Sequence, residues 1–145
     1  MTVNSNSSKQ ISGELKKKNV ILVAVSKTKS TKEMLELYDL GQRDFGENYV
    51  QELTEKYEQL PKDIRWHFIG HLQSNKVKYI APFVSLIHSV DSAKLLKEIN
   101  TQGKKDNRII ECLLQVHIAK EETKFGLSED EVEELINTNY SKPTN

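Results

Sequence analysis

A lysine stands where an apolar run ends near the start of the chain. Residues 20–25 (VILVAV) are consecutive apolar residues, mostly β-branched, and Ser26 and Lys27 follow them. Such a run predicts a strand buried on both faces, as in a parallel sheet, and the segment from Thr31 predicts a helix. Lys27 is therefore expected at the C-terminal end of the first strand of a βα unit, where α/β proteins collect their chemistry. A partly desolvated lysine there, beside a second cation at Lys29, is suited to form a Schiff base with an aldehyde; the alternative is a solvated lysine.

Two further polar segments follow predicted strands. In residues 45–48 (FGEN) the glycine allows a close backbone approach to a ligand, and Asn48 either caps the next helix or hydrogen-bonds into the site. In residues 66–76 (WHFIGHLQSNK) the exposed amides of a helix start would attract an anion such as phosphate. His67 and His71 have the spacing of a zinc pair, but that site needs a continuous helix. The glycine between them and the β-type run before it argue against one, so no metal site is predicted.

Weaker signals come later in the chain. The predicted strand 109–118 has one polar face, which indicates either a polar lumen or an edge strand that faces water. Cys112 lies on the apolar face and is interpreted as a small buried hydrophobic residue. Lys124 either places a second cation near the site or is a loop charge, and the residues alone favour the loop charge.

The predicted helices and strands around these residues recur at regular intervals along the chain. Residues 1–8 are predicted to be disordered, residues 9–136 to form one domain, and residues 137–145 to be an unpatterned tail. The predicted strands are 20–26, 43–45, 65–69, 84–90 and 109–118, after a short helix at 9–18. Helices follow the strands, and capping-box sequences mark two of them, at Ser30/Glu33 and Ser128/Glu131.

Five βα units recur about every twenty residues, which predicts an α/β fold of the (β/α)8 TIM-barrel type. A full barrel needs eight units and about 200 residues or more, so the expectation is an incomplete barrel or a small doubly wound sheet.

Composition excludes several classes of function. The chain has 145 residues, of which 21 are basic and 21 acidic, so its formal net charge is zero. It therefore lacks the excess of positive charge that is typical of proteins that bind nucleic acids. The longest apolar run is too short to span a membrane, and the polar start has no signal-peptide core. A single cysteine excludes an internal disulfide, and a cytoplasmic location is expected.

Five segments together resemble one family in their order and spacing. They are residues 24–29 (AVSKTK), 41–52 (GQRDFGENYVQE), 66–76 (WHFIGHLQSNK), 87–91 (IHSVD) and 115–126 (QVHIAKEETKFG). The family is that of the YggS/PROSC pyridoxal phosphate homeostasis proteins, which share the alanine racemase N-terminal barrel, and the resemblance covers residues 20–136. It implies that Lys27 holds pyridoxal 5′-phosphate (PLP) as a Schiff base, with Asn48 and Lys124 near the cofactor. It also implies a role in vitamin B6 homeostasis without enzymatic turnover, with PLP-dependent apoenzymes as candidate partners.

One departure from the family pattern affects this site. In the family, residues on the last strands hold the phosphate, and that region has no counterpart in the sequence, which predicts a C-terminally truncated member. Lost phosphate contacts, at about 1.5–3 kcal/mol each, would weaken cofactor binding. Open sheet edges would favour self-association. Two alternatives stay open: a racemase-like PLP enzyme, which would need an acid/base residue from a further domain, and a non-binding fragment of a disrupted gene.

Overall fold

A parallel sheet of five strands, in the order β1-β2-β3-β4-β5, organises the chain. The computed structural model describes residues 2–118 and 126–138. The strands are β1 (Ala24–Val25), β2 (Asp44–Glu47), β3 (Arg65–Phe68), β4 (Leu86–Val90) and β5 (Glu111–Leu114). The helices are α1 (Ser5–Lys17), α2 (Thr31–Asp39), α3 (Val50–Gln59), the 3-10 helix η1 (Ser74–Lys76), α4 (Val77–Ile80), α5 (Ala93–Lys105) and α6 (Glu129–Ile136).

The strand order confirms the predicted α/β fold with barrel-type winding. Each described strand pairs with the next one along the chain, and all pairs are parallel. A doubly wound sheet reverses its strand order at a switch point, and the sheet formed by the described residues has no such reversal. The sheet is open, because β1 and β5 stand at its two edges.

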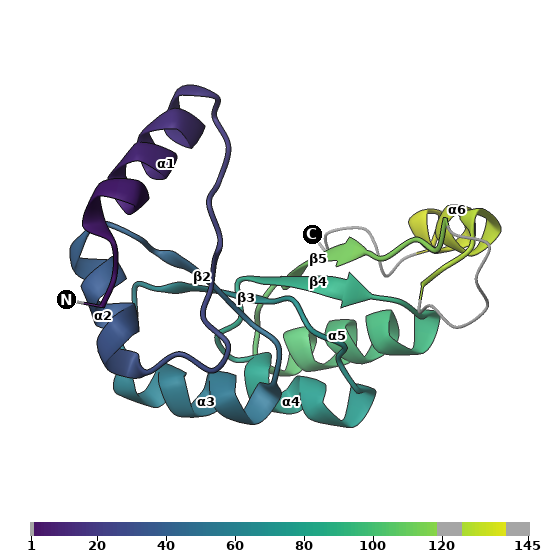
Figure 1. Cartoon of the computed structure of the whole chain (residues 1–145). Coiled ribbons are helices and arrows are strands. Elements are labelled where there is room, and N and C mark those ends of the chain that lie inside the picture. Colours follow the sequence, from purple (N-terminus) through teal and green to yellow (C-terminus); the bar gives the residue numbers. More distant parts are fainter. Residues whose placement is uncertain (1, 119–125, 139–145) are drawn as a thin grey trace.

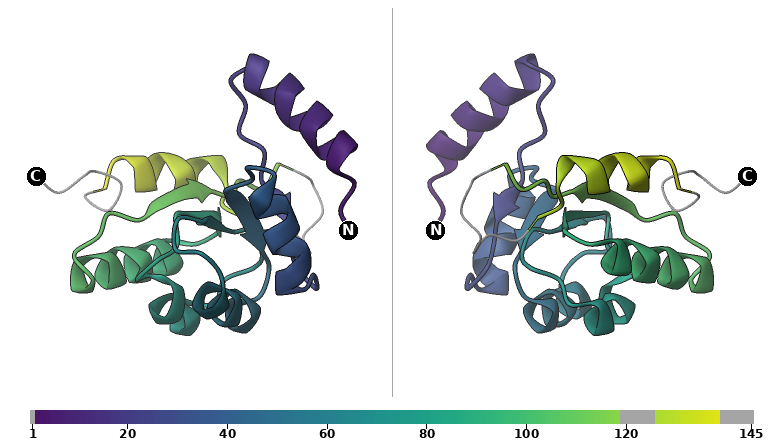
Figure 2. Two further views of the ribbon diagram at one scale, coloured as in Figure 1. Left: turned by 90° about the vertical axis from the view of Figure 1, so that its left-hand side faces the viewer. Right: turned by 90° about the vertical axis from the view of Figure 1, so that its right-hand side faces the viewer.

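Helices α3, α4 and α5 lie side by side along one face of the sheet, and α1 projects away from it (Figure 1; Figure 2). The strands turn their large apolar side chains towards these helices, with Phe45, Trp66 and Ile87 at most 1% exposed. This face holds the core, whereas α1 contains no buried residue. The described helices include none long and apolar enough to cross a membrane.

Local capping signals are confirmed. The hydroxyl oxygens of Ser30 and Ser128 accept hydrogen bonds from the backbone N–H groups of Glu33 and Glu131, and the serine backbone N–H groups donate to the two glutamate carboxylates. These capping boxes start α2 and α6 at the residues that the sequence predicts.

Three predicted boundaries are wrong. The helix predicted at 9–18 begins earlier, at Ser5, where the side chain of Asn4 caps α1 by accepting from the backbone N–H of Ser7. The strand predicted at 20–26 is reduced to Ala24–Val25, because β2 is its only neighbour in the described sheet. The strand predicted at 109–118 ends at Leu114, and beyond it a single bridge joins Val116 to Leu127.

Candidate functional site

Lys27 lies in a tight turn directly after β1. The backbone N–H of Lys29 donates to the carbonyl of Ser26 at 3.0 Å and closes a four-residue turn. Thr28, the third residue of this turn, has a φ of +64°. The residues alternate in burial: Ser26 is 3% exposed, whereas Val25 and Lys27 are exposed. The strand-end position predicted for Lys27 is confirmed, but the side chain is more exposed than the partial desolvation expected from the sequence.

A buried polar network lies beneath this turn. The Nζ of Lys56, on α3, donates to the carbonyl of Ser26 at 2.6 Å, to Oε1 of Glu47 at 2.6 Å and to Oε1 of Glu52 at 2.7 Å. The Oγ of Ser26 donates to Oε1 of Glu47 at 2.9 Å, and the N–H of Thr28 donates to Oε1 of Glu52 at 2.6 Å. Lys56 is 5% exposed and Glu47 is fully buried. The network therefore connects α3, β2 and both sides of the Lys27 turn.

Glu47 is the most deeply buried charge of the network. Burial raises the pKa of its carboxyl, and the hydrogen bonds from Lys56 and Ser26 only partly oppose that rise. Its second oxygen, Oε2, is buried without a hydrogen-bond partner within residues 2–118 and 126–138. Sequence reasoning missed this network. The only local signal was the four-residue spacing of Glu52 and Lys56 on one helix, which is common on solvated helix faces.

Asn48 lies at the end of β2, beside the turn that carries Lys27. The pairing of Val25 with Gly46 brings these two strand ends to the same edge of the sheet. Tyr49, rather than Asn48, is the N-cap of α3, and it makes no side-chain capping bond, so the predicted cap by Asn48 is wrong. The Oδ1 atom of Asn48 is buried, and none of the residues that the structure describes donates a hydrogen bond to it. An orphaned acceptor at this edge is a polar group that a ligand can use.

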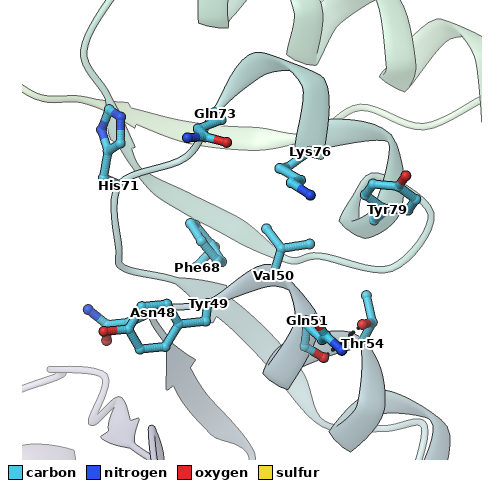
Figure 3. A pocket seen from close by; sticks show the side chains of 10 residues that line it. All are labelled: Asn48, Tyr49, Val50, Gln51, Thr54, Phe68, His71, Gln73, Lys76 and Tyr79. Carbon is cyan, nitrogen blue, oxygen red and sulfur yellow. Dashed lines mark hydrogen bonds between the residues drawn. The ribbon is translucent and has the colours of Figure 1, made fainter.

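A pocket of about 470 Å³ opens next to Asn48, between the start of α3 and the η1–α4 segment. Phe68 and Val50 line its apolar part, and the Lys76 side chain extends into it from η1 (Figure 3). The other lining residues are mostly polar or aromatic: Asn48, Tyr49, Gln51, Thr54, His71, Gln73 and Tyr79. The helix start predicted near Ser74 is a three-residue 3-10 turn followed by the four-residue α4.

A second polar cluster crosses the sheet on its other face. The Nε2 of His67 lies 2.9 Å from Oδ1 of Asp44, and its Nδ1 lies 2.9 Å from Nε2 of His88. Arg65 donates two hydrogen bonds to Asp44. Burial opposes ionisation of Asp44, but Arg65 and His67 hold the pKa of that carboxyl below its usual value. Burial lowers the pKa of His88, and the neighbouring His67 lowers it further by a smaller amount. His67 therefore contacts Asp44 and His88 within the sheet. It does not pair with His71, whose Nδ1 lies 3.2 Å from a carboxylate oxygen of Asp91.

Two further residues singled out in the sequence are Cys112 and Lys124. Cys112 is half-buried, and burial raises the pKa of its thiol, in keeping with a packing role. Lys124 lies outside the residues that the structure describes. The described ranges contain no cluster of three or more histidine, cysteine or acidic residues that could hold a metal ion.

Comparisons with known proteins converge on one family. The family model "Alanine racemase, N-terminal domain" matches residues 6–143. The pyridoxal phosphate homeostasis protein of Aquifex aeolicus is 42% identical over 123 residues, which cover 84% of this chain and 54% of that protein. The human protein of the same name is 41% identical over 124 residues, covering 79% of this chain and 45% of its own length. The chain thus spans about half the length of the curated relatives it matches.

Solved structures agree with this result. PipY of Synechococcus elongatus PCC7942, solved without PLP, matches with a TM-score of 0.74 and 34% identity over 82% of this chain and 57% of that one. The structure of PipY with PLP bound matches with a TM-score of 0.75 and 28% identity, over 92% of this chain and 65% of that one. The fold described above is therefore shared with a protein that binds PLP.

Proposed function

This chain belongs to the alanine racemase N-terminal domain family, and we propose that it binds PLP through Lys27 and acts in PLP homeostasis, as its relatives' names indicate. The observation that carries the proposal is the position of Lys27. It lies on an exposed turn at the C-terminal end of a parallel strand, above a buried network that holds the turn. Ligand chemistry gathers at this end of parallel strands.

The residues at this edge fit such a cofactor. When bound, PLP supplies an aldehyde, and its condensation with an amine forms a C=N bond and releases water. Lys27 offers an amine on an exposed turn. Asn48 offers its buried Oδ1, which is unpaired in the described part of the chain, to a donor group of the ligand. In this proposal Asn48 and Lys124 are the further residues near the cofactor, with Lys124 as a cation for the phosphate.

Trapping tests the attachment site. The protein is incubated with PLP, reduced with borohydride and mapped by peptide mass spectrometry. We expect most of the label on Lys27, and a loss of about tenfold or more in total label for Lys27→Ala, because in this proposal the held turn presents the Lys27 amine to the cofactor. Lys29→Ala is the matched control and should keep the label at Lys27. Label found mainly on Lys29, Lys124 or other lysines of the wild-type protein contradicts the proposal.

We propose a carrier rather than an enzyme, located in the cytoplasm, which passes PLP to PLP-dependent apoenzymes. The relatives' shared name supports a homeostatic role. Racemase assays with common amino acids separate this role from the enzyme alternative. A rate above that of free PLP that disappears in Lys27→Ala would favour the racemase.

The open sheet supports a further part of the proposal, self-association. β1 and β5 are edge strands, and exposed apolar side chains lie on or beside them, with Val25 55% and Leu113 50% exposed. Sedimentation velocity should show an average mass that rises with concentration, because unpaired strand edges and apolar patches favour association. Leu113→Lys should shift the protein towards monomer, whereas Ile11→Lys, on α1, should not. If the wild-type protein stays monomeric at all concentrations, the proposed self-association is wrong.

A further inference from the structure

The turn that carries Lys27 is held from both sides by one helix. Ser26, immediately before Lys27, receives a hydrogen bond on its carbonyl from Lys56 at 2.6 Å. Thr28, immediately after Lys27, donates its backbone N–H to Glu52 at 2.6 Å. Lys56 and Glu52 lie one turn apart on α3 and contact each other at 2.7 Å. The four groups form a closed ring of contacts around the backbone of Lys27.

The turn needs such support because its backbone is strained. A φ of +64° lies in the left-handed region, which suits glycine and disfavours β-branched residues such as threonine. A turn with positive φ at its third residue usually has glycine or asparagine there. Strain of this kind persists only where surrounding contacts impose it, and it gathers at functional sites. Glu52 supplies the contact at Thr28 itself.

The helix side of the ring is itself fixed in place. Lys56 is 5% exposed, and its ammonium is also bound to Glu47, which is fully buried on β2. A cation held by two carboxylates and a carbonyl has little freedom to move. The carbonyl of Ser26 therefore meets a rigid donor, and the exposed Lys27 side chain projects from a backbone whose direction α3 determines.

We propose that Lys56 and Glu52 are positioning residues, which hold the Ser26–Lys29 turn in its strained conformation and so direct the Lys27 amine towards the cofactor. The proposal rests on the proposed attachment of PLP to Lys27. Neither residue reacts with the cofactor. Their effect is to make Lys27 more readily modified than the other exposed lysines of the chain, because its amine is presented in one orientation.

The test uses Glu52→Ala, which removes the contact at Thr28 and leaves the buried pair of Lys56 and Glu47 in place. Glu58→Ala is the matched control, since Glu58 is an exposed residue of the same helix. Thr28→Gly is combined with Glu52→Ala as a rescue, because glycine adopts the positive φ without strain.

The first measurement is amide hydrogen exchange of the cofactor-free protein. Exchange at Thr28 should be about tenfold faster in Glu52→Ala than in the wild type and unchanged in Glu58→Ala. The amide of Ile69, which donates to the carbonyl of Glu47, is the internal reference for an intact sheet. Unchanged exchange at Thr28 in Glu52→Ala overturns the proposal.

The second measurement is the share of borohydride-trapped label on Lys27 at a limiting concentration of PLP. We expect this share to fall about threefold or more in Glu52→Ala, with label moving to other lysines, and to recover when Thr28→Gly is added. A general loss of structure would not be repaired by a glycine in the turn. A wild-type protein without label at Lys27 contradicts the proposed function, whereas label at Lys27 that is unaffected by Glu52→Ala contradicts only the positioning role.

Discussion

Replacing Lys56 by methionine is expected to lower the free energy of unfolding by about 3–5 kcal/mol, because it leaves a buried carboxylate without its cation. Glu47 is fully buried. Without Lys56, the hydroxyl of Ser26 would be the one side chain among the described residues that still donates a hydrogen bond to it. The substitution also removes the donor to the carbonyl of Ser26. Urea denaturation at neutral pH measures the loss. Lys97→Met on α5 removes an exposed lysine and should change the midpoint little.

A second variant separates charge burial from packing. Adding Glu47→Gln to Lys56→Met removes the unpaired charge while keeping an acceptor for Ser26, so much of the lost stability should return. If the double variant is no more stable than Lys56→Met, the loss arises from packing of the lysine stem and the charge argument is wrong.

The pH dependence of the Lys56→Met variant follows from the pKa of Glu47. Burial raises that pKa in the folded protein, so at intermediate pH the folded state binds a proton that the unfolded state does not. Stability contributed by this group therefore decreases as pH rises through the folded pKa and increases as pH falls. Without Lys56 the effect should be larger, and the gap between variant and wild type should narrow towards acidic pH.

Gly70→Ala is the second variant with a large expected effect, a loss of about 3 kcal/mol, as in severe overpacking. A Cβ at Gly70 would lie 2.2 Å from the backbone oxygen of Asn48 and 2.8 Å from its Cα. Both neighbours are backbone atoms, so no flexible side chain can move aside. The substitution forces apart the chain segments that follow β2 and β3, including the segment that holds Asn48.

The control for this variant is Gly13→Ala on α1. Apart from its chain neighbours and the nearby backbone of α1, no described atom lies within 4 Å of a Cβ built at Gly13, and alanine favours helix over glycine by up to about 1 kcal/mol. Its denaturation midpoint should stay the same or rise. If Gly70→Ala is as stable as the wild type, the backbone at Gly70 does not approach the backbone of Asn48 as closely as the structure indicates.

Local sequence patterns were enough to predict the features that depend on neighbouring residues. The apolar runs predicted the parallel strands, and the serine–glutamate spacing predicted where α2 and α6 begin. The position of Lys27 at a strand end followed from where one apolar run stopped. Each of these signals acts within a few residues, through the burial of neighbouring apolar side chains or through a bond between a side chain and a nearby amide.

The contacts that hold the Lys27 turn, by contrast, arise from the three-dimensional fold. The contact between Lys56 and Ser26 joins residues 30 positions apart, and that between Glu52 and Thr28 joins residues 24 apart. In the sequence Lys56 resembles a solvated lysine on a helix surface. It is buried because α3 packs on the sheet beneath the end of β1, and a buried cation is stable only where Glu47, Glu52 and a carbonyl surround it. Such partners come together only when the sheet forms, which is why local patterns could not reveal them.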